Sequence, residues 1–162
     1  MKTSKIRKVL VAVDYDPTAQ KVAEAAYSMA KAMNAEVTLL HVISDPIFYS
    51  SPEYSPIMGL TDSMGSLGLL RLDSIEELKK VSQHFLDKFK LHLGDEAIQT
   101  IIVEGDYAEV ILNTAKKIHA DVIVMGSHSR KWLENIVMGS VTREVLNNTT
   151  IPLFIIPTKK RD

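Results

Sequence analysis

Short apolar runs alternate along this chain with longer segments in which apolar residues recur every three or four positions. Continuous runs are typical of strands buried on both faces of a sheet, and the periodic segments of amphipathic helices. We predict strands at 9–13, 36–43, 98–103, 121–126 and 153–156, with helices between them. This alternation predicts an α/β fold, with a parallel sheet covered by helices on both faces and joined by right-handed crossovers.

Several residues mark expected helix ends. Asp16 is a favourable N-cap for the first helix, and Pro17 a favourable first helical residue. Asp106 is the expected N-cap of the helix after the third strand, and Gly94 is a natural stop for the helix before it.

The periodicity disappears between residues 44 and 72, where half of the six prolines and three of the seven glycines lie. A structureless stretch of this length inside a compact domain is usually functional or disordered. Neither side of it has enough apolar residues for a core of its own. We therefore interpret residues 1–162 as a single domain with a long irregular loop at about 44–72.

The composition limits the possible classes of function. At 162 residues, with 46% hydrophobic and 24% charged residues, the chain has the composition of one soluble globular domain. Nineteen Lys and Arg against twenty Asp and Glu argue against nucleic acid as a partner. The absence of cysteine excludes disulfides, thiol nucleophiles and cysteine-ligated metals. The first apolar run is too short for a signal peptide or membrane span, so we expect a cytoplasmic protein with no membrane partner.

Candidate chemistry lies at the strand ends, because open parallel sheets bind ligands beyond the carboxyl ends of their strands. The first strand ends in Ala12-Val13-Asp14, whose carboxylate is suited to accept hydrogen bonds from ribose hydroxyls. The fourth strand ends in Met125-Gly126, and Arg130 adds positive charge after it.

The last helix opens with Gly139-Ser140-Val141-Thr142, and nine residues separate Gly139 from Ser129. Small residues let a phosphate approach the backbone, and a helix N-terminus offers unpaired N–H groups and a positive dipole end. This pattern predicts a nucleotide site, although the chain has neither a P-loop nor a G-x-G-x-x-G sequence.

The spacing Gly126-x2-Ser129-x9-Gly139-Ser140 resembles the nucleotide-binding signature of universal stress proteins, G-x2-G-x9-G-[S/T]. The resemblance includes the Val-Asp end of the first strand and the Leu-His-Val end of the second, and it covers nearly the whole chain outside the long loop. It implies a Rossmann-like (HUP-type) three-layer α/β/α fold with strand order 3-2-1-4-5.

The resemblance further implies a cytoplasmic homodimer that binds ATP or AMP, with any Mg²⁺ carried by the nucleotide, and regulates stress response or survival. By position, Asp14 would contact the nucleoside, and Val42 would hold the adenine edge through its backbone. The full set of nucleotide-binding residues carried over is Ala12, Val13, Asp14, Val42, Met125, Gly126, Ser129, Arg130, Gly139, Ser140, Val141 and Thr142.

Ser129 departs from the signature, which has glycine there. A left-handed backbone at this position would make serine cost about 1–2 kcal/mol, whereas a requirement for small size alone would let serine fit. The retained Gly126, Gly139 and Ser140 favour nucleotide binding. The alternative is a ligand-free dimeric scaffold in which Ser129 has ended binding.

Two enzymatic or signalling alternatives are less well supported. A response-regulator receiver would need a phospho-accepting aspartate after the third strand, where this chain has Glu104-Gly105. A slow ATPase would need a base or water-orienting residue near the γ-phosphate, for which the loop offers only His128 and Glu134. We therefore predict no catalytic residue, and no metal site made by protein side chains.

The last strand, Leu153–Ile156, is apolar on both faces. If it lies at the sheet edge, its unpaired backbone groups favour pairing with a second copy across a two-fold axis. The sequence thus predicts a homodimer through this strand.

Overall fold

The computed structural model describes residues 4–14, 18–44, 75–127 and 138–158. Its strands are β1 (Lys8–Ala12), β2 (Glu36–Ile43), β3 (Gln99–Glu104), β4 (Val122–Gly126) and β5 (Leu153–Ile156). Its helices are α1 (Ala19–Met33), α3 (Ile75–Leu93), α4 (Tyr107–Lys117) and α5 (Ser140–Asn148). The predicted loop at 44–72 lies outside the described residues, apart from Ser44.

The five strands form one parallel sheet in the order β3-β2-β1-β4-β5. The predicted fold class and strand order are therefore confirmed. β1 lies at the centre and pairs with both β2 and β4, while β3 and β5 form the two edges. The chain places β2 and then β3 on one side of β1, and β4 and then β5 on the other side. The topological switch point of this fold therefore lies between β1 and β4.

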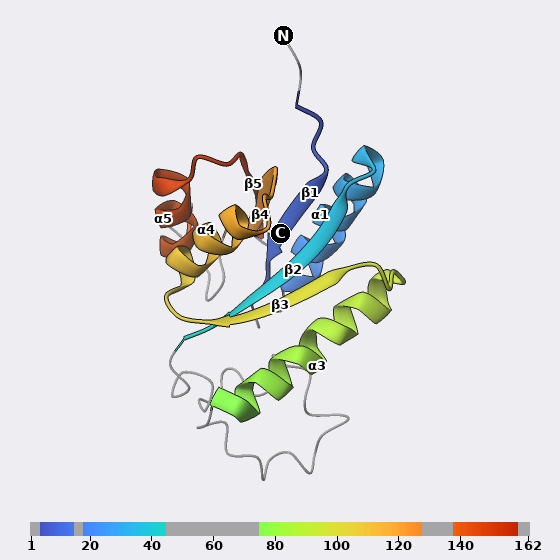
Figure 1. Cartoon of the computed structure of the whole chain (residues 1–162), viewed down its shortest axis with the longest axis vertical. Helices are drawn as coiled ribbons and strands as arrows, with labels where there is room; N and C mark the ends of the chain where they lie inside the picture. The colour runs from blue at the N-terminus through green and yellow to red at the C-terminus, as the bar shows by residue number, and fades with distance from the viewer. Residues whose placement is uncertain (1–3, 15–17, 45–74, 128–137, 159–162) are drawn as a thin grey trace.

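Helices cover both faces of the sheet (Figure 1), with α1 and α3 on one side and α4 and α5 on the other. Strand β2 shows how its sequence supports two cores. Leu39 is buried in the cluster that includes α1 and α3, and its neighbour Leu40 is buried in the cluster that includes α4 and α5. Successive side chains of a strand point to opposite faces, so a continuous apolar run can fill both layers.

Two of the predicted helix ends are confirmed, and the third falls on residues outside the described part of the chain. The Asp106 side chain accepts a hydrogen bond from the backbone N–H of Glu109 at 3.2 Å, capping α4. Gly94 follows α3 in the left-handed conformation, with φ of 67°. Helix α1 begins at Ala19 with Thr18 as its N-cap residue, and the predicted N-cap Asp16 and first helical residue Pro17 lie outside the described residues.

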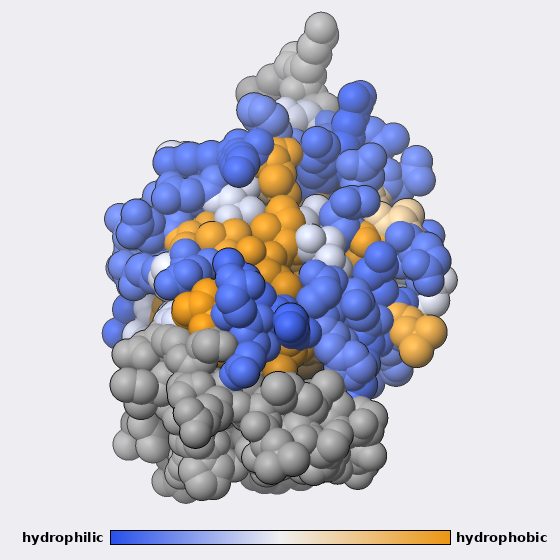
Figure 2. Space-filling view, turned by 60° about the horizontal axis from the view of Figure 1, so that its bottom comes forward, coloured by the Kyte–Doolittle hydropathy of each residue, from blue (hydrophilic) through white to orange (hydrophobic). Residues whose placement is uncertain are grey.

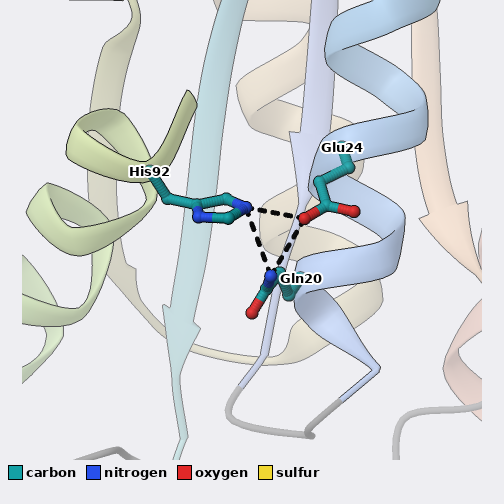
Figure 3. A network of polar contacts seen from close by, with 3 residues as sticks. All are labelled: Gln20, Glu24 and His92. Atoms are coloured by element: carbon teal, nitrogen blue, oxygen red, sulfur yellow. Dashed lines mark hydrogen bonds and ion pairs between the residues drawn. The ribbon is translucent and has the colours of Figure 1, made fainter. Parts of the chain in front are cut away.

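A polar cluster links the neighbouring helices α1 and α3 (Figure 3). His92 Nε2 lies 2.6 Å from Glu24 Oε1, and Gln20 Nε2 donates to the same oxygen at 2.9 Å. The Gln20 bond is the first cause of the lowered pKa of Glu24, and the His92 bond is the second. The side chains of His92 and Glu24 are both about half exposed, at 51% and 46%, so this link is open to solvent.

A second polar link closes the amino-terminal end of the sheet. One carboxylate oxygen of Asp121 accepts hydrogen bonds from the backbone N–H groups of Arg7 and Lys8, at 2.8 and 2.9 Å. These two bonds are the leading causes of the lowered pKa of Asp121. They join the start of β1 to the residue before β4, at the edge opposite the predicted ligand site.

On the face that Figure 2 shows, the described residues form an apolar band between hydrophilic areas. Large apolar side chains that are exposed among the described residues are Leu91, Leu146 and Phe154. In that same part of the chain, each helix is too short or too polar to cross a bilayer.

Candidate functional site

The predicted site residues in the described part of the chain gather where three central strands end and α5 begins. Ala12 is the last residue of β1, Val42 the penultimate residue of β2, and Gly126 the last residue of β4. Ser140 is the first residue of α5. Because β1, β2 and β4 are parallel neighbours, their carboxyl ends lie at one edge of the sheet. Ser129 and Arg130 lie outside the described residues.

The chain beyond β1 is fixed by two hydrogen bonds to β2. The backbone N–H of Val13 donates to the oxygen of Leu40 at 2.9 Å. The imidazole of His41 lies with Nδ1 3.0 Å from the oxygen of Val13. Val13 is buried, and Asp14 after it is half-buried.

His41 is a buried residue of this edge to which sequence analysis assigned no role. Only 1% of its surface is exposed, and burial lowers the pKa of its ring to about 4, although the hydrogen bond that the ring makes to the Val13 oxygen acts to raise the pKa. The ring is therefore neutral at pH 7. A carbonyl oxygen can only accept, so Nδ1 carries the proton that binds Val13.

The start of α5 is anchored directly to the end of β4. The backbone N–H of Gly139 donates to the oxygen of Ser127 at 2.7 Å. The hydroxyl of Thr142 donates to the oxygen of Gly126 at 2.9 Å. These two bonds bring the N-terminus of α5, with its N–H groups and positive dipole end, to the carboxyl edge of the sheet.

The site residues differ in what they present to solvent. Ser140 is exposed at the first position of α5, and Val141 and Gly139 are half-buried. The side chains of Met125 and Val42 are buried in the core cluster on the α4 side of the sheet. Their side chains therefore pack the core, while their backbones belong to the strand ends that border the site.

Ser127 connects β4, β5 and α5, and sequence analysis did not single it out. Its hydroxyl accepts from the backbone N–H of Thr158 at 3.0 Å and lies 3.2 Å from the Thr158 hydroxyl. Its own N–H donates to Ile156 at 2.9 Å. The only sequence signal for this role was a small polar residue directly after the strand. Its hydrogen-bond partner, Thr158, lies 31 positions away, so the sequence did not reveal the bond.

The described residues contain no group of three or more His, Asp and Glu side chains suited to hold a metal ion. The polar chemistry of this edge comes instead from backbone N–H groups at the start of α5, the exposed Ser140 hydroxyl and the Asp14 carboxylate. These are groups that recognise phosphate and sugar hydroxyls. The hydroxyl of Thr142 is buried and donates to the oxygen of Gly126, so it has a structural role.

Comparison with known proteins identifies the family to which the chain is similar. The model of the universal stress protein family matches residues 5–157. Universal stress protein MJ0531 of Methanocaldococcus jannaschii is 31% identical over 159 residues, covering 96% of this chain and 85% of the relative.

Solved structures agree with the fold. The structure of hypothetical protein MJ0577 has a TM-score of 0.68 and 25% identity, covering 98% of this chain and 100% of that one. A universal stress protein crystallised in complex with cAMP has a TM-score of 0.63 and 17% identity, covering 96% of this chain and 100% of that one. With the family model spanning nearly all of its length, the chain belongs to the universal stress protein family.

Proposed function

We propose that this protein binds an adenine nucleotide, ATP or AMP, at the carboxyl edge of β1, β2 and β4. The observation that carries the proposal is the attachment of α5 to β4 through Gly139 and Thr142. It presents a helix N-terminus at the switch point of a parallel sheet, where such folds bind phosphate-bearing ligands.

In this proposal each element of the edge has one task. The first turn of α5, with Gly139, Ser140 and Val141, binds the phosphates together with Ser129 and Arg130. Asp14 accepts hydrogen bonds from the ribose, and the backbone of Val42 contacts the adenine. Any Mg²⁺ arrives with the nucleotide. A fold relative solved in complex with cAMP is consistent with a nucleotide as the ligand class.

The direct test is the nucleotide content of the purified protein, followed by calorimetric titration with ATP and AMP. We expect binding that Asp14→Ala and Gly139→Val weaken without loss of fold. Asp121→Ala is the matched control, because it removes a carboxylate at the opposite edge of the sheet. No bound nucleotide, and no heat at millimolar ATP, would replace this proposal with the ligand-free scaffold. Phosphate release from ATP would identify a slow ATPase.

We also propose a homodimer formed by pairing of β5 with β5 of a second copy. β5 is an edge strand, and Phe154 on it is 52% exposed. An exposed aromatic residue on an unpaired edge favours association.

Analytical ultracentrifugation at micromolar concentration tests the dimer. Phe154→Asp is expected to give monomers, whereas Leu91→Asp, at a 79% exposed position on α3, is expected to leave the dimer intact. A monomeric wild-type protein contradicts the proposal. With nucleotide occupancy altering dimer behaviour or partner choice, the protein would act as a cytoplasmic regulator of stress response or survival, without nucleic acid or membrane partners.

A further inference from the structure

The peptide group between Val13 and Asp14 lies beyond the end of β1 and is hydrogen-bonded to β2. β1 ends at Ala12, yet the N–H of Val13 still donates to Leu40 at 2.9 Å. The oxygen of Val13 then accepts from His41 Nδ1 at 3.0 Å. Both polar backbone groups of Val13 are thus satisfied by two consecutive residues of β2.

This second bond determines where the chain leads next. A peptide group is planar, and the described residues contain no cis peptide bond. Fixing the direction of the Val13 carbonyl therefore also fixes the opposite direction of the Asp14 N–H and the position of the Asp14 Cα atom. The Asp14 side chain starts from that atom.

The His41 ring is itself held firmly on the α3 side of β2. Its centroid lies 5.9 Å from that of Phe85, in an edge-on arrangement with an interplanar angle of 69°. Phe85 in turn packs edge-on against Phe89, with centroids 4.8 Å apart. A ring this closely packed keeps one rotamer, so its N–H stays directed at Val13.

We propose that His41 is a positioning residue of the nucleotide site, and that its hydrogen bond to Val13 holds the Asp14 carboxylate in place for the ribose hydroxyls. The inference rests on the proposed nucleotide function. A histidine that merely fills the core would affect stability alone, whereas a positioning residue would also affect recognition of the ribose.

Four variants test this assignment. His41→Asn keeps an N–H donor close to the Nδ1 position, whereas His41→Leu removes the donor and His41→Gln moves it farther along the side chain. Phe85→Leu weakens the packing but keeps the donor. For each folded variant, calorimetry gives the Kd for ATP, 2′-deoxy-ATP and 3′-deoxy-ATP, and thermal denaturation gives the Tm.

We expect wild type to prefer ATP over at least one deoxy analogue. His41→Leu and His41→Gln should weaken ATP binding about tenfold and lose that preference, as we also expect of Asp14→Ala. In the Asp14→Ala background, the same His41 changes should have little further effect. His41→Asn and Phe85→Leu should keep the preference even where their Tm falls.

Three results would overturn the inference. One is a folded His41→Leu or His41→Gln protein with wild-type ribose preference. Another is a wild-type protein that binds ATP without preferring it over either analogue. The third is a double variant whose loss of ATP affinity equals the product of the two single-variant losses, as independent sites would give. A wild-type protein that binds no nucleotide at all would refute the proposed function as well, which distinguishes the two failures.

Discussion

The hydroxyl of Thr142 donates a 2.9 Å hydrogen bond to the backbone oxygen of Gly126. A side chain in the first turn of α5 thereby satisfies a carbonyl group at the last residue of β4. Thr142 is only 4% exposed, so water cannot easily replace the hydroxyl. Removal of this group leaves a poorly solvated acceptor at the edge of the proposed site.

Thr142→Val, which keeps the shape but not the hydroxyl, should lower the free energy of unfolding by about 1–2 kcal/mol. It should also weaken nucleotide binding, because α5 loses one attachment to β4. Thr142→Ser should recover most of both effects. Urea denaturation and calorimetry measure them, and a valine variant as stable as wild type would show that the bond contributes little.

His41 should make the stability depend on pH between about 4 and 6.5. Burial lowers its pKa from 6.5 to about 4 in the folded protein. In that window the unfolded chain binds a proton that the folded protein does not, so stability is lost as pH falls from 6.5 towards 4. The full effect is on the order of 3 kcal/mol.

Urea denaturation from pH 4.5 to 7.5 measures this dependence, with His41→Asn as the reference that cannot titrate at this position. The difference between the two curves isolates His41, because the carboxylates are common to both proteins. Parallel curves would contradict the prediction.

Asp121 should contribute a separate loss of stability at lower pH. The N–H groups of Arg7 and then Lys8 lower its pKa in the folded protein. A lowered folded pKa means that the contribution is present above the unfolded pKa and is lost as pH falls through the folded value. Asp121→Asn should be less stable at neutral pH and lose less on acidification, as acid titration followed by circular dichroism would show. An equal loss of stability on acidification in both proteins would assign that loss to other groups.

Gly105 and Gly94 should differ in their tolerance of alanine, although both have positive φ. A Cβ atom at Gly105, where φ is 148°, would lie 2.8 Å from Cγ2 of the buried Val110. A Cβ at Gly94, where φ is 67°, meets nothing within 4 Å. We expect a cost of about 2–3 kcal/mol for Gly105→Ala and about 1 kcal/mol for Gly94→Ala, measured by urea denaturation. A lower cost for Gly105→Ala than for Gly94→Ala would mean that the side chain of Val110 moves away from the new Cβ atom easily.

The Glu24–His92 contact should contribute little to stability in spite of its 2.6 Å length. Both side chains are about half exposed, and solvent and salt screen such pairs. His92→Gln should lower the free energy of unfolding by less than about 1 kcal/mol, and less still at high salt. Leu86→Ala, at a fully buried position on the same helix, should cost about 2–5 kcal/mol. A larger loss for His92→Gln would indicate a structural role.

The sequence alone determined the order and type of the elements, because hydrophobic periodicity is a local signal. The run Leu39-Leu40 reads as a strand buried on both sides, and the two residues do lie in different core clusters. Asp106 caps α4 as predicted, since an N-cap bond reaches only three residues along the chain. The parallel sheet and its strand order followed from the alternation and the family resemblance.

Contacts between distant segments were decided by the tertiary structure. His41 meets the Val13 oxygen across 28 positions, and Ser127 meets Thr158 across 31. No local pattern marks such pairs, because each is created when parallel strands come into register and bring their ends together. The sequence predicted which residues border the proposed ligand site, and the tertiary structure decided which hydrogen bonds hold the carboxyl ends of the strands in place there.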